Sequence, residues 1–312
     1  MLQIQKITLI LFLSCIGLNL PRPAQAQQDA QYTLFMFNGL TLNPAYAGSR
    51  DRFSITGLFR KQWVGIEGAP TTQTLSMHTP IFGQKMGVGL MLTNDRVGDS
   101  KIFTLKGSYA YRLKVGQSFL ALGLHAGFTQ YRADYLDVRY ALNPNFQDVA
   151  FNQNLNETLF NIGTGIYYHN ERFYASFSVP QMINNNLTGG ISDARQSVHY
   201  FLSTGYVFNM KGSIKIKPAI FAKFVSGSPI SLDFNTNVNI KDFLEVGVSY
   251  RWDDSIDFLL ILPMGRNLAF GYAYDATLTE LNKYNSGSHE IMLRYEFNVL
   301  GKSEKILTPR YF

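Results

Sequence analysis

Hydrophobic and polar residues alternate with a period of two along most of this chain. Within residues 119–128, for example, Leu122 and Leu124 fall on one face, whereas Gly123 and His125 fall on the other. A period of two is typical of extended strands whose two faces differ. Bulky apolar and aromatic side chains gather on one face, and small or polar residues gather on the other. This arrangement predicts a wall with lipid outside and a crowded polar lumen inside.

The alternation divides into fourteen candidate strands, and no segment with helical periodicity interrupts them. The predicted strands cover residues 52–63, 71–80, 85–94, 102–112, 117–131, 158–169, 172–179, 197–208, 214–225, 229–239, 242–251, 255–262, 267–275 and 288–298. The predicted fold class is therefore all-β, a transmembrane antiparallel β-barrel of the outer-membrane type with about 14 strands.

The connections between these strands sort by length. Every second connection is short, at residues 81–84, 113–116, 170–171, 209–213, 240–241 and 263–266. The remaining connections include every long one, at residues 64–70, 95–101, 132–157, 180–196 and 276–287. Short turns at one end and long loops at the other are typical of outer-membrane barrels, in which the short turns face the periplasm. A soluble β-sandwich has no reason to sort its loops in this way.

Basic residues recur at the short turns. They either solvate the turns or form a docking surface for a periplasmic partner, and the residues are Lys85, Arg112, Lys114, Lys211, Lys241 and Arg266. The whole chain has 28 Lys and Arg against 22 Asp and Glu. Because this excess is small and scattered, it does not indicate a nucleic-acid interface.

The N-terminus predicts a secretory signal peptide. Lys6 supplies a positive charge, residues 7–20 form an apolar core, and Ala24-Gln25-Ala26 is a small-x-small cleavage site. The alternative is a lipoprotein signal that uses Cys15, which is the only cysteine in the chain. Cleavage after Ala26 would leave a mature chain without thiols for disulfides or metal clusters.

Four units are expected on this basis. They are a signal peptide at 1–26, an N-terminal periplasmic or plug segment at 27–50, a transmembrane β-barrel at 51–299 and a periplasmic C-terminal tail at 300–312. The segment at 27–50 is too apolar to extend freely into water, so we expect it to pack inside the barrel or under its periplasmic mouth. Small lumen-facing residues such as Gly123 leave room for this segment or for part of a partner. Both termini are expected in the periplasm.

No constellation of residues predicts enzymatic chemistry, a cofactor or a metal site. The five histidines lie in different segments without metal-ligand spacing. His199 and Ser203 share a face but are roughly 13 Å apart along one strand, too far for a nucleophile–base pair. The run from Asp253 to Asp257 lacks the glycine and glutamate of a calcium loop, so it is interpreted as a polar hairpin turn. His289 and Glu290 point to opposite faces, and we expect them to have a structural role where the last strand closes on the first.

Ordered motifs carry a resemblance to a known family. They lie in residues 31–48 (with Asn43-Pro44-Ala45-Tyr46-Ala47-Gly48), 60–72, 85–96, 107–112, 271–275 and 287–293. Together these blocks resemble the PorP/SprF family of outer-membrane proteins of the type IX secretion system in Bacteroidetes. The resemblance implies a non-enzymatic barrel that supports secretion or surface anchoring of cargo, such as gliding adhesins, and docks periplasmic components of the machine. The alternative function is a passive porin or solute channel.

The same resemblance nominates residues for partner binding: Asn43, Pro44, Tyr46, Gly48, Gln62, Trp63, Gly65, Gly68, Asp95, Arg96, Tyr274, Asp275, His289 and Glu290. The partners that it implies are periplasmic and outer-membrane components of the secretion system and one large secreted adhesin or C-terminal-signal cargo protein. The lipid bilayer surrounds the barrel, and no nucleic acid is expected.

Overall fold

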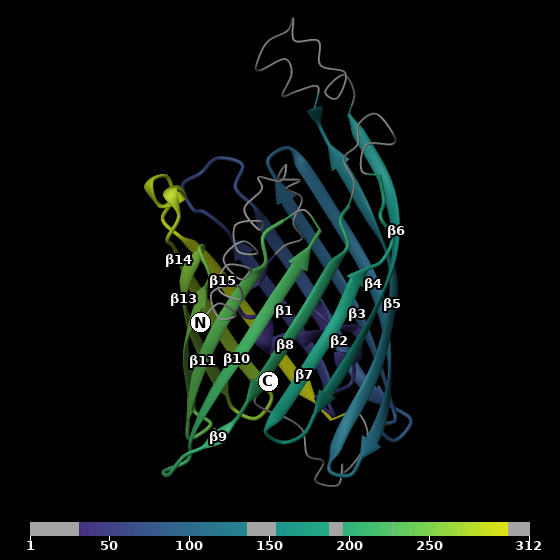
Figure 1. Cartoon of the computed structure of the whole chain (residues 1–312), viewed down its shortest axis with the longest axis vertical. Coiled ribbons are helices and arrows are strands. Elements are labelled where there is room, and N and C mark those ends of the chain that lie inside the picture. Colours follow the sequence, from purple (N-terminus) through teal and green to yellow (C-terminus); the bar gives the residue numbers. More distant parts are fainter. Residues whose placement is uncertain (1–30, 136–153, 187–195, 227, 299–312) are drawn as a thin grey trace, which may run out of the picture.

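The computed structural model describes residues 31–135, 154–186, 196–226 and 228–298, and its strands form one closed antiparallel barrel (Figure 1). The strands are β1 (Phe53–Lys61), β2 (Thr71–Ile81), β3 (Met86–Val97), β4 (Ser100–Val115), β5 (Ser118–Ala133), β6 (Leu155–His169), β7 (Phe173–Gln181), β8 (His199–Tyr206), β9 (Phe208–Asn209), β10 (Ile214–Val225), β11 (Ser231–Ile240), β12 (Leu244–Arg251), β13 (Ser255–Met264), β14 (Leu268–Thr277) and β15 (Ser288–Phe297). The 3-10 helices within the described residues are η1 (Phe35–Phe37), η2 (Gly39–Thr41), η3 (Pro44–Tyr46) and η5 (Glu280–Lys283).

The barrel closes where the first strand pairs with the last. In this antiparallel pair of β1 and β15, Phe53 lies opposite Phe297 and Lys61 lies opposite His289. Strands β8 and β9 are two parts of one barrel strand, because both pair with β10 and only the buried Val207 separates them. The wall therefore has fourteen strands, which confirms the predicted fold class.

The two faces of the wall follow the alternation in the sequence. Large apolar side chains such as Leu124 and Phe160 are more than 60% exposed on the outside. Polar side chains such as Asn237 and Asp257 are completely buried on the inside. This inverts the usual distribution of a water-soluble protein and matches a wall between lipid and a polar lumen. Within the described residues, no helix is long and apolar enough to cross a membrane.

The two ends of the barrel carry different connections. The short-turn end holds the turns at residues 82–85, 116–117, 170–172, 210–213, 241–243 and 265–267. The opposite end is called here the long-connection end, and its described residues are 62–70, 98–99, 134–135, 154, 182–186, 196–198, 226, 228–230, 252–254 and 278–287. In Figure 1 the long-connection end is at the top, where β5 and β6 reach furthest.

One predicted long loop is wrong. Residues 95–101 are not a loop, because β3 and β4 continue to a two-residue turn at Gly98 and Asp99. Gly98 has a φ of +57°, which suits such a turn. With 16 residues, β4 spans roughly 50 Å, about twice the apolar band of an outer-membrane barrel. Beyond that band both faces of the hairpin meet water, so the alternation of apolar and polar residues fades although the strands continue.

Candidate functional site

Residues 31–50, called here the lumenal segment, run through the inside of the barrel from one end to the other. Near the long-connection end, the side-chain amide of Gln31 donates a hydrogen bond to the Ser231 hydroxyl at 3.4 Å. At the short-turn end, Arg50 forms an ion pair with Glu296 near the end of β15. Most side chains between these points are buried, including Leu34 and Phe35 in the main apolar cluster of the lumen. The segment therefore occupies the space that a solute channel would need.

Glycines on the lumenal face make room for the backbone around η3. A Cβ atom on Gly87 would collide with the carbonyl group of Ala47, and one on Gly123 would collide with the backbone of Ala45. A Cβ atom on Gly165 would likewise meet the side chain of Asn43. These glycines of β3, β5 and β6 thus form a seat that fits this segment closely.

Asn43 is the residue that fixes η3 in this seat. Its Oδ1 accepts a hydrogen bond from the Ala45 amide at 2.8 Å and so caps the short helix. Its Nδ2 lies within hydrogen-bond distance of the Ile166 carbonyl at 2.9 Å and the Ser176 hydroxyl at 2.8 Å. Because Asn43 is only 2% exposed, these bonds satisfy polar atoms that cannot reach water.

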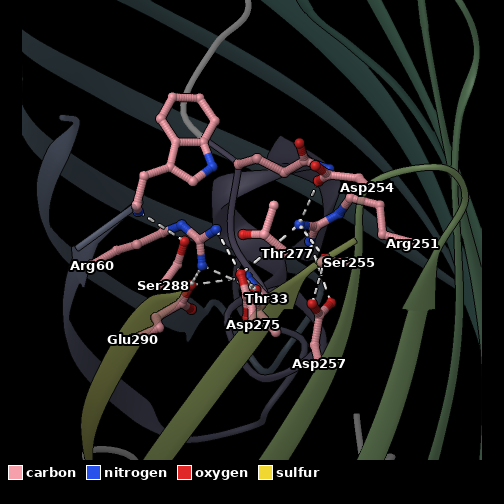
Figure 2. A network of polar contacts seen from close by, with 12 residues as sticks. Thr33, Arg60, Arg251, Asp254, Ser255, Asp257, Asp275, Thr277, Ser288 and Glu290 are labelled. Carbon is pink, nitrogen blue, oxygen red and sulfur yellow. Dashed lines mark hydrogen bonds and ion pairs between the residues drawn. The ribbon is translucent and has the colours of Figure 1, made fainter. Parts of the chain in front are cut away.

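Arg60 on β1 is the centre of a buried ionic network (Figure 2). Its guanidinium group lies 2.8 Å from Asp275 on β14 and 3.0 Å from Glu290 on β15. Glu290 also accepts hydrogen bonds from the backbone amides of Thr33 and Leu34, each at 2.9 Å. The Thr33 hydroxyl donates to Asp275 at 2.8 Å. The network therefore joins the closing seam of the barrel to the start of the lumenal segment.

Arg251 on β12 extends this network across neighbouring strands. Its side chain lies 2.9 Å from Asp233 and 3.7 Å from Asp257. A longer contact of 3.9 Å to Asp275 connects it with the Arg60 group. All four residues are almost completely buried. A buried charge that loses its partner is far more costly than an exposed one, so these groups depend on one another.

A second group of charges holds the other end of the lumenal segment. The Arg112 guanidinium donates to the Gly48 carbonyl at 2.9 Å and lies 3.0 Å from Asp51. Gly48 also donates its amide to His78 Nδ1 at 3.1 Å, and its φ of +75° suits glycine. Tyr46 packs edge-on against the His78 ring at a centroid distance of 5.4 Å.

The structure divides the predicted partner-binding residues into groups. Asn43, Pro44, Tyr46 and Gly48 are buried in the lumenal segment, and Asp275 and Glu290 accept hydrogen bonds from Thr33 at its start. The other candidates lie at the long-connection end or on the outer face: Gln62, Trp63, Gly65, Gly68, Asp95, Arg96, Tyr274 and His289.

Hydrogen bonds and ring contacts hold several of these candidates in place. Trp63 donates its amide to the Ser288 hydroxyl at 3.1 Å, which links the connection after β1 to the start of β15. Asp95 accepts a hydrogen bond from Thr72 at 2.6 Å, whereas Arg96 is exposed. Half-buried His289 accepts or donates a hydrogen bond of 2.7 Å with Tyr272 and packs 5.2 Å from the Tyr274 ring. Gly65 and Gly68 are exposed and have positive φ values.

Several residues of the ionic network were not among the candidates. These residues are Thr33, Arg60, Arg251 and Asp233. A charged residue at a lumen-facing position of a strand, such as Arg60 or Arg251, is a pattern that the sequence alone shows. The sequence predicts that Asp257 belongs to a polar hairpin turn. The turn spans only residues 252–254, and Asp257 is fully buried in β13. Among the residues that the structure describes, no three histidine, cysteine or carboxylate side chains form a metal-binding group.

The closed wall, its apolar outer face and its charged lumen define an outer-membrane β-barrel protein. One solved structure supports the fold: a monoaromatic hydrocarbon channel, CymD, is 10% identical with a TM-score of 0.50, covering 83% of this chain and 92% of that one. The Acinetobacter baumannii outer membrane protein Omp33 is 11% identical with a TM-score of 0.41, covering 79% and 98% respectively. A search of curated protein sequences found no match.

The family is defined by the sequence. Residues 24–295 match the model of the type IX secretion system membrane protein PorP/SprF. The chain belongs to this family, as the resemblance of its motifs implied.

Proposed function

We propose that this protein is a non-enzymatic, non-conducting barrel that supports the secretion or surface anchoring of type IX cargo and docks periplasmic components of the machine. The observation that carries the proposal is the lumenal segment, which crosses the barrel. Its start is hydrogen-bonded to the buried Glu290, and its end is held by the ion pair of Arg50 with Glu296. A lumen filled in this way leaves the ends of the barrel as the surfaces available to partners. The secreted partner would be a large adhesin or another cargo protein with a C-terminal signal.

In the proposed orientation the short-turn end faces the periplasm, as in other outer-membrane barrels. The wall then begins with Phe53 and ends with Phe297 on the periplasmic side. Gln31, at the start of the lumenal segment, lies at the opposite end of the barrel. Of the described residues, the first and last of the wall are therefore on the periplasmic side, whereas the start of the lumenal segment is not. The predicted signal peptide and C-terminal tail lie outside the described residues.

The alternative function, a passive porin, is favoured by the fold alone, and fold does not fix function. Among the cavities in the described part of the chain, one lies on each side of the lumenal segment. The cavity toward the long-connection end has a volume of about 140 Å³ and is lined in part by Tyr32 and Lys223. The cavity at the short-turn end has a volume of about 430 Å³ and is lined in part by Phe37 and Arg50.

A deletion strain tests the proposed function. We expect the deletion to remove either all type IX cargo or one cargo protein from the culture medium and cell surface, measured by quantitative mass spectrometry. The wild-type gene restored on a plasmid is the control. Loss of all cargo indicates a core component, and loss of one indicates a dedicated partner. Unchanged secretion, together with purification of the barrel without any secretion component, would contradict the proposal.

A further inference from the structure

The cavity at the short-turn end, called here the mouth pocket, has a strongly basic lining. Its cationic residues are Arg50, Arg52, Lys217, Arg266 and Arg294, and its acidic residues are Asp242, Glu245 and Glu296. If every group is ionised, five positive charges face three negative ones, an excess of two. The long-connection half of the lumen differs, because there the carboxylates Asp233, Asp257, Asp275 and Glu290 surround Arg60 and Arg251.

The deep part of the mouth pocket is built from buried groups. Glu296 forms an ion pair with Arg50, and its carboxylate also lies 3.6 Å from Nε of Arg294. Lys217 forms an ion pair with Glu245 and lies over the Phe37 ring at 5.3 Å. The side chain of Lys217 is fully buried, and that of Arg294 is 10% exposed. One carboxylate shared by two guanidinium groups leaves a positive potential at the base of the pocket.

The rim of the mouth pocket supplies two arginines for a ligand. Half-buried Arg52 lies just before β1, and exposed Arg266 lies in the turn between β13 and β14. In the described part of the chain, neither side chain has an ion-pair partner. A guanidinium group presents a planar set of donors that matches a carboxylate and can bind it with two hydrogen bonds.

The positive charge continues onto the outer surface of the short-turn end. Exposed basic residues in its turns and adjoining strand ends are Lys85, Lys114, Arg172, Lys211 and Lys241, in addition to Arg266. The exposed acidic residues in these turns are Glu171 and Asp242. A field of one sign around a recessed pocket concentrates ligands of the opposite charge and speeds their association.

We propose that the mouth pocket binds a carboxylate-rich peptide segment of a periplasmic protein. This inference rests on the orientation in the proposed function and gives the chemistry of the docking partner. A peptide fits better than an anionic lipid surface, because Arg50, Lys217 and Arg294 lie inside the lumen, where headgroups in the surrounding bilayer do not reach. A chain bearing several carboxylates can enter the cavity of about 430 Å³ and contact the rim arginines at the same time.

Binding of an acidic peptide to the purified full-length barrel tests this inference. The probe is a fluorescein-labelled decaglutamate peptide, with a decaserine peptide as the neutral comparison, and fluorescence anisotropy in a non-ionic detergent is the readout. We expect saturable binding of decaglutamate that weakens as salt is raised. The double variant R52Q/R266Q should weaken binding by about tenfold, since each lost charge-assisted contact is a substantial part of such an affinity.

The matched control is K85Q/K114Q, which removes two exposed charges from the same end but outside the mouth pocket. It should change binding by less than about twofold. Heat-modifiable migration on gels confirms that each variant is a folded barrel. The inference is overturned if decaglutamate does not bind, if both double variants weaken it equally, or if R52Q/R266Q affects only binding to phosphatidylglycerol vesicles.

The same variants separate this inference from the proposed function. If the deletion strain loses cargo but decaglutamate does not bind, the inference fails and the proposed function stands. If decaglutamate binds in the mouth pocket but the deletion leaves secretion unchanged, the proposed function fails and the pocket chemistry stands.

Discussion

Replacing Arg60 with leucine is expected to lower the free energy of unfolding by about 3–5 kcal/mol. The arginine side chain is 1% exposed and lies against two carboxylates, Asp275 and Glu290, that are 4% and 0% exposed. Without the guanidinium group these carboxylates stay buried with no opposing charge at that position. Equilibrium unfolding in urea, followed by tryptophan fluorescence of the barrel in detergent, measures the effect.

Arg96 provides the matched control, because it is an exposed arginine on β3. The R96L variant should remain within about 0.5 kcal/mol of the wild type. R60K keeps the charge but not the two-pronged geometry, so its stability should fall between those of R60L and the wild type. If R60L unfolds at the same urea concentration as R96L, the ionic network does not hold the barrel as described.

Replacing Gly123 with leucine is expected to force η3 from its seat in the lumen. Even a Cβ atom at this position collides with the backbone of Pro44 and Ala45, and backbone cannot move aside as a flexible side chain can. In the folded variant, chymotrypsin should then cut the chain after Tyr46, which is 4% exposed in the wild type. Limited digestion of the barrel in detergent, with the cut sites identified by mass spectrometry, measures the difference.

Gly107 on β4 is the control for this substitution. It faces outward, and the nearest atom to an added Cβ is the Ala126 carbonyl oxygen at 4.0 Å. G107L should therefore show the same protection of the lumenal segment as the wild type. Equal protection in G123L would show that η3 is not seated against Gly123.

The barrel was predictable from the sequence because its signal is local. Each strand alternates apolar and polar residues within about ten positions. The short and long loops can be assigned to opposite ends of the barrel without any knowledge of contacts. The limit of this signal is visible at Asp95 and Arg96, where the strand continues although the polar residues predict a loop. The closing of the last strand on the first also followed from counting strands, and the pairing of β1 with β15 confirms it.

The ionic network was not predictable in the same way, because it depends on register around the closed ring. Thr33 and Glu290 are 257 positions apart in the chain and meet only when the barrel is closed and the lumenal segment is inside it. Glu290 and Asp275 were selected for their place in family motifs, and the motifs did not reveal that Arg60 pairs with both. The lumenal glycines indicated empty space, but the sequence left open whether this chain or a partner fills it.

The central claim is that the lumenal segment blocks the lumen of the barrel. Conductance in planar lipid bilayers tests it most directly. The wild-type protein should insert without steady current steps, whereas a variant lacking residues 32–47 should give steady ones, because the removed residues occupy the lumen between the two cavities. Steady porin-like steps from the wild-type protein would contradict the account.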